Sequence, residues 1–360
     1  MKLIHCADLH LDSKIDTLPP EKSKIRREEI VRTFERLCSY ATENGVTAVI
    51  IAGDMFDTKR ITKKTAGKIF TAIKNSSDTE FLYLSGNHDE ETFLKEENEE
   101  LPSNFKIFGK EWTSFDFGDA VVTGITLDKV NSGFVYDTLN LKEDRINVVC
   151  MHGQIYGYNT SSESAEVINL PRLKGKNIDY LALGHIHSFS REKLDDRGVY
   201  AYSGCLDGRG FDETGVKGFV LLEIENGKIA DRFVPFCSRI FYTEEFSVSE
   251  EEGSFYQFAD KTVKELLERC DRNGLIKVVV KGERNADFEV DKDDLTDKLS
   301  ENFFFAKVYD KTTLKISYSD YAADKSVRGE FVRLVLDSDL SDEEKTAVLS
   351  KGLNALKGEL

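Results

Sequence analysis

The stretch TAVIIAGDMFD, residues 47–57, holds the strongest indication of the fold. Its first six residues form an apolar run rich in β-branched side chains, which is typical of a strand buried on both faces of a parallel sheet. One glycine and two carboxylates, Gly53, Asp54 and Asp57, follow this run directly. Ligands of open α/β sheets bind at the carboxyl ends of the strands. These polar residues therefore mark the expected edge of a functional site.

Four further predicted strands end in polar residues of the same kind. The spacing of apolar residues between them predicts amphipathic helices at 22–43 and around 66–73. This alternation predicts an α/β fold with a mostly parallel sheet, and hairpin patterns after residue 190 predict antiparallel strands in a second sheet packed on the first. The strand at 2–6 is followed by Asp8 and His10, and the strand at 80–84 by Asn87, His88 and Asp89. The strand at 146–151 is followed by His152, and the strand at 179–183 by His185 and His187.

Five of the six histidines lie in these loops. Imidazoles with carboxylates and one amide, without a thiolate, are typical of a catalytic site for manganese, iron or zinc. Each motif taken alone also fits turn residues and satisfied core histidines, whereas their joint occurrence favours a metal site. The candidates are too many for one ion and suffice for two ions that share Asp54. They are Asp8, His10, Asp54, Asn87, His152, His185 and His187.

The motifs D-x-H, G-D-x-x-D, G-N-H-D, an isolated histidine and G-H-x-H resemble those of the calcineurin-like metallophosphoesterase superfamily. The resemblance implies a four-layer α/β/β/α sandwich with two divalent ions, usually manganese. By this resemblance His88 contacts the phosphate and assists the leaving oxygen. We expect Asp57 and Asp89 to orient ligands by hydrogen bonds, and His5 to be an ordinary buried histidine. The resemblance assigns Asp8, His10, Asp54 and His187 to the first ion, and Asp54, Asn87, His152 and His185 to the second.

A narrower resemblance lies in residues 202–213, YSGCLDGRGFDE, and in residues 326–332, SVRGEFV. Both are similar to DNA repair exonucleases, namely SbcD-type nuclease subunits and their YhaO-like relatives. This branch implies hydrolysis of phosphodiester bonds in DNA, and an SMC-like coiled-coil ATPase as partner. We expect a nuclease domain at 1–240, a small α+β capping domain at 241–320, and C-terminal helices at 321–360 as a candidate partner-binding region.

The chain has 360 residues, with 49 basic and 65 acidic side chains and a net charge of −16. This balance argues against DNA binding by a basic surface alone, so any polyanion partner would need a local site, such as bound metal ions. Five basic residues lie near the motif loops and are candidate DNA contacts, with solvated surface charge as the alternative: Lys59, Arg60, Lys63, Lys64 and Arg209. Six scattered cysteines predict reduced thiols in a cytoplasmic protein. No apolar run reaches the length of a membrane span.

The sequence leaves two alternative functions open. The first is a metallophosphatase or phosphodiesterase that acts on small phosphoesters. A protein phosphatase is disfavoured because Asp57 is followed by Thr58 and Lys59 rather than by Arg-Gly. The second is a catalytically silent scaffold, which the complete ligand set disfavours. The apolar residues at 327–335 either dock a coiled coil or pack on their own domain, and the sequence does not decide whether the protein forms a homodimer.

Overall fold

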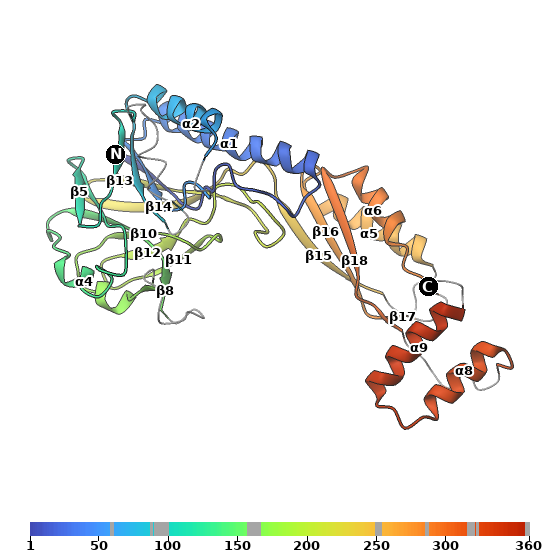
Figure 1. Ribbon diagram of the computed structural model, residues 1–360. Coiled ribbons are helices and arrows are strands. Elements are labelled where there is room, and N and C mark those ends of the chain that lie inside the picture. The colour runs from blue at the N-terminus through green and yellow to red at the C-terminus, as the bar shows by residue number, and fades with distance from the viewer. Residues whose placement is uncertain are drawn as a thin grey trace. The chain divides into compact units, whose positions relative to one another are not determined.

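The computed structural model describes residues 1–57, 61–86, 89, 101–156, 167–248, 254–284, 288–314, 321 and 324–356. The chain divides into two compact units, Met1–Phe241 and Tyr242–Leu360 (Figure 1). The units have separate hydrophobic cores. The predicted division into three parts, at 1–240, 241–320 and 321–360, stays a prediction.

The first unit contains two six-stranded sheets. In the first sheet four strands run parallel in the order β1-β2-β3-β4. The hairpin of β13 and β14 extends this sheet on the other side of β1, where β13 runs antiparallel to β1. The bounds are β1 (Lys2–Cys6), β2 (Ala48–Ala52), β3 (Glu80–Leu84), β4 (Phe105–Ile107), β13 (Gly218–Glu225) and β14 (Lys228–Pro235).

The second sheet has the order β11-β12-β10-β7-β6-β5, with four parallel strands between antiparallel edge strands. The hairpin strands after residue 190 were predicted to form this sheet, but β13 and β14 join the first sheet instead. An apolar run of residues predicts that a strand is buried, but it does not predict which neighbouring strand will pair with that strand. The bounds are β5 (Thr113–Asp116), β6 (Ala120–Gly124), β7 (Ile146–His152), β10 (Tyr180–Gly184), β11 (Ser190–Lys193) and β12 (Val199–Tyr202).

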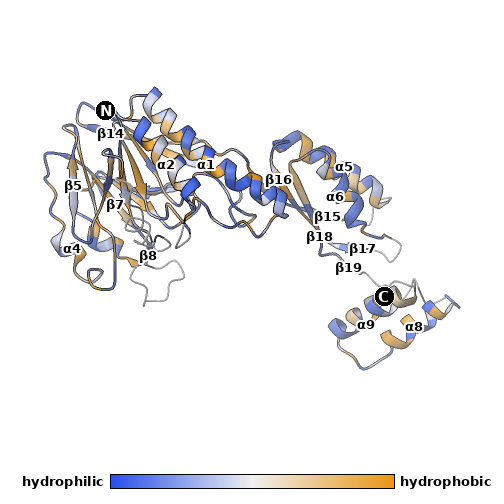
Figure 2. Cartoon of the chain, turned by 45° about the horizontal axis from the view of Figure 1, so that its top comes forward, coloured by the Kyte–Doolittle hydropathy of each residue, from blue (hydrophilic) through white to orange (hydrophobic). Residues whose placement is uncertain are grey.

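An apolar layer lies between the two sheets. Alternate residues of the strands supply it, since successive side chains of a strand point to opposite faces of the sheet. Ile50 and Leu82 of the first sheet and Val148 and Ala182 of the second belong to this layer and are fully buried. Figure 2 shows hydrophobic and hydrophilic residues interspersed along the strands of the first unit. This layer places the carboxyl ends of the central strands of both sheets near one another.

Helices α1 (Pro20–Glu43) and α2 (Lys63–Asn75) cover the outer face of the first sheet (Figure 1). The ring of Phe34 on α1 lies 6.5 Å from the ring of Phe81 on β3, centroid to centroid. Gly45 follows α1 with a φ of +62°, as the predicted helix end requires. The side chain of Thr62 caps α2 by accepting a hydrogen bond from the Thr65 N–H.

Short elements cover the outer face of the second sheet within the described ranges. They are α4 (Val135–Thr138), a 3₁₀ turn at Leu170–Leu173, and the paired strands β8 (Gln154–Ile155) and β9 (Val167–Ile168). Tyr136 and Leu173 from these segments pack with Leu181 of β10 in a second buried cluster. The α/β sandwich predicted from the sequence is confirmed.

The second unit has a three-stranded sheet in the order β15-β16-β18, and α5 and α6 share its core. Strands β17 and β19 form a separate parallel pair. Helices α8 and α9 pack on each other through Val332, Val335, Leu349 and Leu353. The bounds are β15 (Phe241–Ser247), α5 (Phe255–Arg269), β16 (Leu275–Lys281), β17 (Glu283–Arg284), α6 (Lys292–Ser300), β18 (Phe305–Asp310), β19 (Thr313–Leu314), α8 (Val327–Leu336) and α9 (Asp342–Leu356).

Among the helices that the structure describes, none combines the length and the apolar composition needed to cross a membrane. All six cysteines fall in the described ranges, and each is a free thiol. Five of them are buried, and Cys237 is partly buried.

Candidate metal centre

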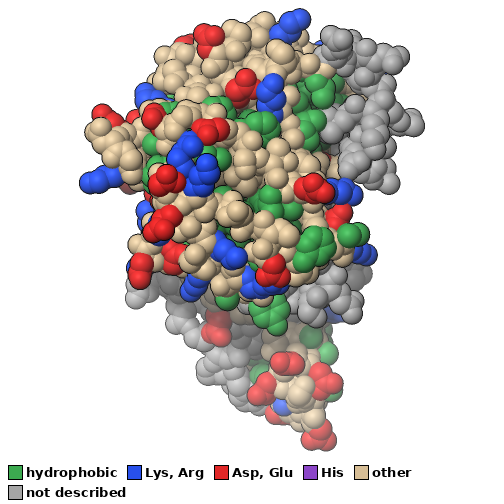
Figure 3. Space-filling view, turned by 90° about the vertical axis from the view of Figure 1, so that its left-hand side faces the viewer, with side chains coloured by type: hydrophobic (Ala, Val, Ile, Leu, Met, Phe, Trp, Pro, Cys, Tyr) green, Lys and Arg blue, Asp and Glu red, His purple; other side chains and the backbone are tan. Residues whose placement is uncertain are grey.

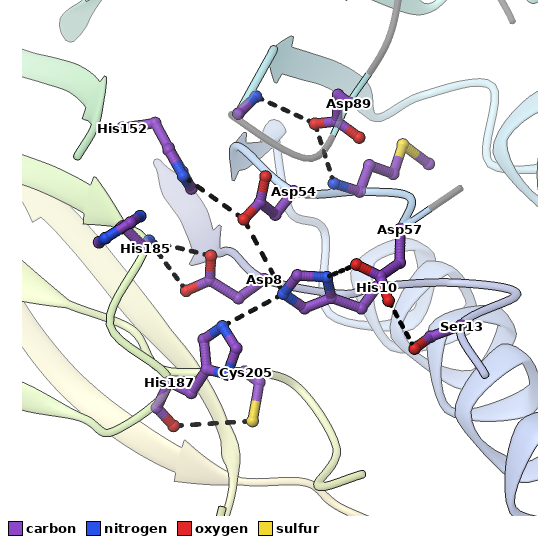
Figure 4. Close-up of polar contacts among 12 residues, drawn as sticks. Asp8, His10, Ser13, Asp54, Asp57, Asp89, His152, His185, His187 and Cys205 are labelled. Carbon is purple, nitrogen blue, oxygen red and sulfur yellow. Dashed lines mark hydrogen bonds and ion pairs between the residues drawn. The ribbon is translucent and has the colours of Figure 1, made fainter. Parts of the chain in front are cut away.

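The candidate ligands meet where strands of the two sheets end (Figure 4). Asp8 and His10 follow β1, and Asp54 follows β2, while His152 ends β7. The loops after β1 and β2 stay hydrogen-bonded to each other, because the N–H groups of Asp8 and His10 donate to the carbonyls of Gly53 and Asp54. His187 follows β10 and faces His10. Both sheets thus contribute ligands to one centre.

These side chains form two overlapping groups whose ligand atoms lie within 4.8 Å of one another. The first group is Asp8, His10 and His187, and the second is Asp8, Asp54 and His152. Oδ2 of Asp54 lies 3.9 Å from Nε2 of His10 and 3.5 Å from Nε2 of His152. One carboxylate oxygen of Asp54 therefore faces a candidate ligand of each predicted ion, which is the arrangement that a bridging carboxylate requires.

The rings of His10 and His187 point their Nε2 atoms at each other across 3.2 Å. Each ring turns its other nitrogen toward a carboxylate. Nδ1 of His10 lies 3.3 Å from Oδ1 of Asp57, and Nδ1 of His187 lies 2.7 Å from Oε1 of Glu213. A carboxylate at Nδ1 favours the tautomer that keeps its proton there and leaves the Nε2 lone pair for a metal ion.

Asp57 and Glu213 are both held in the ionised form. Burial alone raises the pKa of Asp57, but the neighbouring imidazole of His10, a hydrogen bond from Ser13 and the charge of Arg209 outweigh it and lower the pKa to about 2. Burial acts in the same way on Glu213, and hydrogen bonds from His187 and Arg209 lower the pKa of this carboxyl well below its usual range. Asp57 thus lies beside Nδ1 of His10, its orienting role stays a prediction, and Glu213 has the equivalent place beside His187.

Asp89 organises the loop backbones and does not face the ligand atoms. Its carboxylate accepts hydrogen bonds from the N–H groups of Met55, Phe56 and Gly86, at 3.2, 2.8 and 3.0 Å. Burial raises the pKa of Asp89 in spite of these hydrogen bonds. The side chain joins the loops that follow β2 and β3, as expected of a residue that positions ligands.

The backbone at the ligands adopts rarely populated conformations. Four candidate ligands have φ in the left-handed region, which residues with a Cβ seldom adopt outside functional sites. A Cβ added to Gly53 would overlap the ring of His152, and one added to Gly184 would overlap the carbonyl of Ala52. These two glycines are therefore required by the close approach of the loops. The values of φ are +52° for Asp8, +44° for His10, +52° for Asp54 and +103° for His185.

His185 lies beside the second group of ligands. Its ring centroid is 5.4 Å from that of His152, and its N–H donates to Oδ1 of Asp8 at 2.9 Å. His185 thus lies beside the second group, whereas His187 belongs to the first group. The predicted residues Asn87, His88, Lys59 and Arg60 lie outside the described residues.

Arg209, a candidate DNA contact, belongs to the charge network of the centre. Its guanidinium donates from Nε and Nη2 to Oε1 of Glu213 at 3.0 and 2.8 Å, and its Nη1 lies 3.4 Å from Oδ2 of Asp57. The loop that carries Arg209 is anchored on α1, where the fully buried Arg26 donates to Asp207 at 2.7 Å and to the carbonyl of Gly208 at 2.7 Å. A DNA contact by Arg209 stays a prediction.

The donor set fits a pair of divalent cations. Asp8, Asp54, His10 and His152 are at most 2% exposed, so two carboxylates lie deep inside the protein. Burial raises the pKa of Asp8, which means that its charged form lacks sufficient compensation from the chain alone. Two converging imidazole lone pairs beside these carboxylates match the mixed nitrogen and oxygen ligands of catalytic metal sites. Bound cations would compensate the buried negative charge.

Comparisons with known proteins point to the same chemistry. A family model described as Calcineurin-like phosphoesterase matches residues 1–189. The DNA double-strand break repair protein Mre11 of Methanopyrus kandleri is 26% identical over 329 residues, which cover 81% of this chain and 67% of that protein. The uncharacterized metallophosphoesterase YhaO of Bacillus subtilis is 27% identical over 259 residues, which cover 65% of this chain and 60% of that protein.

A third relative is named as part of a nuclease. The SbcD component of the nuclease SbcCD from Staphylococcus saprophyticus is 23% identical over 268 residues, covering 65% of this chain and 69% of that protein. The matched region thus spans 60 to 69% of the length of these three relatives. The family model covers more than half of the chain and includes every candidate metal ligand. The chain therefore belongs to the calcineurin-like phosphoesterase family, whose members are metal-dependent hydrolases with a dinuclear metal site.

Proposed function

We propose that this phosphoesterase is a DNA nuclease that hydrolyses phosphodiester bonds in DNA repair, and that manganese is its metal. The observation that carries the proposal is the pair of overlapping Asp and His groups, in which two histidines are oriented by carboxylates. The similarity to proteins named for DNA double-strand break repair and for nuclease activity supports DNA as the substrate. Iron or zinc would also suit these ligands.

The proposal divides the ligands between two ions that share Asp54. Asp57 and Glu213 keep the Nδ1 protons of His10 and His187 in place, so that both Nε2 lone pairs face inward. Asp89 fixes the loops after β2 and β3. Two metal ions held by these residues would supply a nucleophilic hydroxide at neutral pH and would neutralise charge on the phosphate. The proposed ligands are Asp8, His10, Asp54 and His187 for one ion, and Asp54, Asn87, His152 and His185 for the other.

His88 is proposed to donate a hydrogen bond or a proton to the departing 3′ oxygen. General acid assistance is typically worth about 10²–10⁴-fold in rate. We therefore expect His88→Ala to lower kcat for DNA cleavage by a factor in this range while manganese still binds with nearly wild-type affinity. Isothermal titration with manganese and single-turnover cleavage, carried out on the same preparation, check the two parts. A parallel loss of metal affinity and rate would contradict this division of roles.

A titration with manganese tests the proposed substrate. Purified protein is offered linear single-stranded DNA, linear double-stranded DNA and 4-nitrophenyl phosphate at increasing manganese concentrations. We expect manganese-dependent cleavage of DNA, its loss in Asp54→Asn, and its retention in Asp119→Asn, which removes an exposed carboxylate distant in sequence from the ligands. Hydrolysis of the monoester without DNA cleavage would favour a phosphatase. Metal-loaded protein without either activity would favour a scaffold.

We further propose that α8 and α9 bind an SMC-like coiled-coil ATPase, and that the protein acts in the cytoplasm. Val332 and Val335 pack against α9, whereas Val327 and Leu334 are 73% and 65% exposed and leave an apolar strip on α8. An amphipathic partner helix can bind such a strip. Size-exclusion chromatography with light scattering, using the purified ATPase, tests this proposal and also reports any homodimer. Co-elution that is lost in Leu334→Asp supports it, and absence of co-elution contradicts it.

A further inference from the structure

A pocket of about 180 Å³ lies between α1 and α2 in the first unit. Four of its lining residues are cationic: Lys24 and Arg27 from α1, and Lys64 and Lys68 from α2. The two from α1 are three positions apart and the two from α2 are four positions apart, so each pair occupies one face of its helix. The pocket therefore brings two pairs of positive charges together from two helices.

These four cations are available to a ligand. All four side chains are exposed, and within the described part of the chain none of them takes part in an ion pair. The carboxylate of Asp12, which also lines the pocket, is already engaged: it accepts a hydrogen bond from the N–H of Thr62 at 2.7 Å and lies 3.4 Å from the hydroxyl of Thr65. Glu28 is the second acidic residue of the lining.

The charge of this pocket differs from that of the protein as a whole. Four positive and two negative side chains line it, whereas the complete chain carries a net charge of −16. On the face of the first unit shown in Figure 3, basic and acidic side chains are interspersed. An excess of positive charge in a concave site raises the local concentration of an anionic ligand. The pocket is thus a local cationic site of the kind that an acidic DNA-binding protein needs.

The pocket is connected to the metal centre by a short piece of chain. Asp12 lies two residues after His10, so their Cα atoms are at most about 7 Å apart. Asp12 also binds the N–H of Thr62, the residue that caps α2. The first turns of α2, which carry Lys64 and Lys68, are therefore fastened to the same loop that supplies Asp8 and His10. The pocket and the metal centre therefore share the loop that follows β1.

We propose that this pocket binds backbone phosphates of the DNA strand whose scissile bond lies at the metal centre. Lysine ammonium groups act as point charges toward phosphate, and such contacts hold a strand in register without reading its sequence. The inference rests on the proposed nuclease function, for which it supplies a binding site for the uncleaved part of the strand. It assigns a role to four residues that belong to no motif.

The salt dependence of DNA binding tests this inference. The affinity of a fluorescein-labelled single-stranded 20-mer is measured between 50 and 200 mM salt for wild type, Lys64→Gln/Lys68→Gln and Lys24→Gln/Arg27→Gln. Each phosphate contact contributes about 0.7 to the slope of log K against log salt for single strands. Loss of two contacts should lower the slope by about 1.4 and weaken binding about 10- to 30-fold at 0.1 M salt.

Lys74→Gln is the control, because it removes one positive charge from the last turn of α2, outside the pocket lining, and its effect is compared with half of that of a double variant. The inference predicts wild-type binding for this control. It is overturned if both double variants keep the wild-type slope, or if Lys74→Gln alone causes an equal loss. DNA cleavage with unchanged slopes in the double variants would reject the pocket and leave the nuclease function standing. Binding with the predicted slopes, without cleavage, would reject the nuclease function and leave the pocket standing.

Discussion

His187 is held by a carboxylate that lies 26 residues further along the chain. Oε1 of Glu213 is 2.7 Å from Nδ1 of His187, and Arg209 binds the same carboxylate. The charge of Arg209 helps to keep Glu213 ionised, so Glu213 is an acceptor and the Nδ1 proton of His187 stays in place. Through this chain of contacts a residue that is not itself a candidate ligand fixes the direction of the Nε2 lone pair.

Glu213→Gln should weaken manganese binding by about 10- to 100-fold, the usual effect of removing a residue that orients a metal-bound histidine. The glutamine amide retains the size of the side chain but loses the negative charge that favours the Nδ1 proton. Isothermal titration with manganese measures the change. The matched control is Asp212→Asn, which removes the neighbouring exposed carboxylate and should leave the affinity unchanged. Equal affinities for wild type and Glu213→Gln would refute the orienting role.

The sequence predicted Asp57 as an orienting residue but did not reveal Glu213. Asp57 belongs to a motif next to the ligand Asp54, so its part in the site follows from chain proximity. Glu213 contacts His187 from a separate loop, which Arg26 of α1 anchors through Asp207. Glu213 belongs to the segment 202–213 that resembles DNA repair exonucleases. The spacing of residues within that segment does not predict the contact between Glu213 and His187.

At the scale of elements, the site depends on loops that begin where strands stop. The loops after β1 and β2 run side by side with hydrogen bonds from Asp8 to Gly53 and from His10 to Asp54. This pairing forces left-handed backbone at several ligands and leaves no room for a Cβ at Gly53. The strain is local, because the buried strands on both sides hold the loops in place.

Gly53→Ala should destabilise the protein by about 2–5 kcal/mol, since a Cβ there would overlap His152 and the φ of +93° disfavours alanine. Gly67→Ala is the matched control: Gly67 lies within α2, and an added Cβ meets nothing within 4 Å. This control should stabilise the protein by about 0.5–1 kcal/mol. Urea unfolding measures both changes, and equal midpoints for Gly53→Ala and wild type would contradict the steric argument.

The strands that carry ligands were predictable, whereas several other strands were not. The residues of β1, β2 and β3 form buried apolar runs followed by polar motifs, which mark both the strand and its end. Strand β5, Thr113–Asp116, is short and half-exposed, so its sequence lacks that contrast. The assignment of β7 and β10 to a second sheet was not predictable either, because strand pairing is set by tertiary packing.

At the scale of the whole first unit, His5 joins the two sheets. It lies on β1, fully buried, and its ring reaches β10 of the other sheet. Nε2 lies 3.2 Å from the carbonyl of Leu183 and therefore carries the proton, while Nδ1 accepts from the hydroxyl of Tyr180 at 2.9 Å. Burial lowers the pKa of His5 to about 3, although the bond to Leu183 acts in the opposite direction.

This depressed pKa predicts a loss of stability in weak acid. Between pH 6.5 and pH 3 the unfolded chain binds a proton at His5 that the folded protein does not bind. The free energy of unfolding should therefore fall by about 1.4 kcal/mol for each pH unit below about 6.5. Urea unfolding of wild type and His5→Gln between pH 7 and pH 5 isolates this contribution. A variant with the same pH dependence as wild type would show that His5 is not the group responsible.

The net charge of −16 excluded a uniformly basic DNA-binding surface but could not locate a local cationic site. Lys24, Arg27, Lys64 and Lys68 come together only because α1 and α2 pack side by side on one sheet. The family and the metal chemistry could be inferred from motifs, since motif residues follow strands in fixed order. The contacts between separate helices and strands could not be inferred from motifs, because they form only in the folded protein.

Crystals soaked in manganese test whether the Asp and His cluster of the first unit binds two metal ions. Anomalous diffraction at the manganese edge should reveal two peaks about 3.5–4 Å apart, the separation expected of a two-metal site. We predict these peaks among Asp8, His10, Asp54, His152 and His187, with Asp54 contacting both ions. The absence of manganese from this cluster, or peaks at some other place in the first unit, would contradict the proposed metal centre.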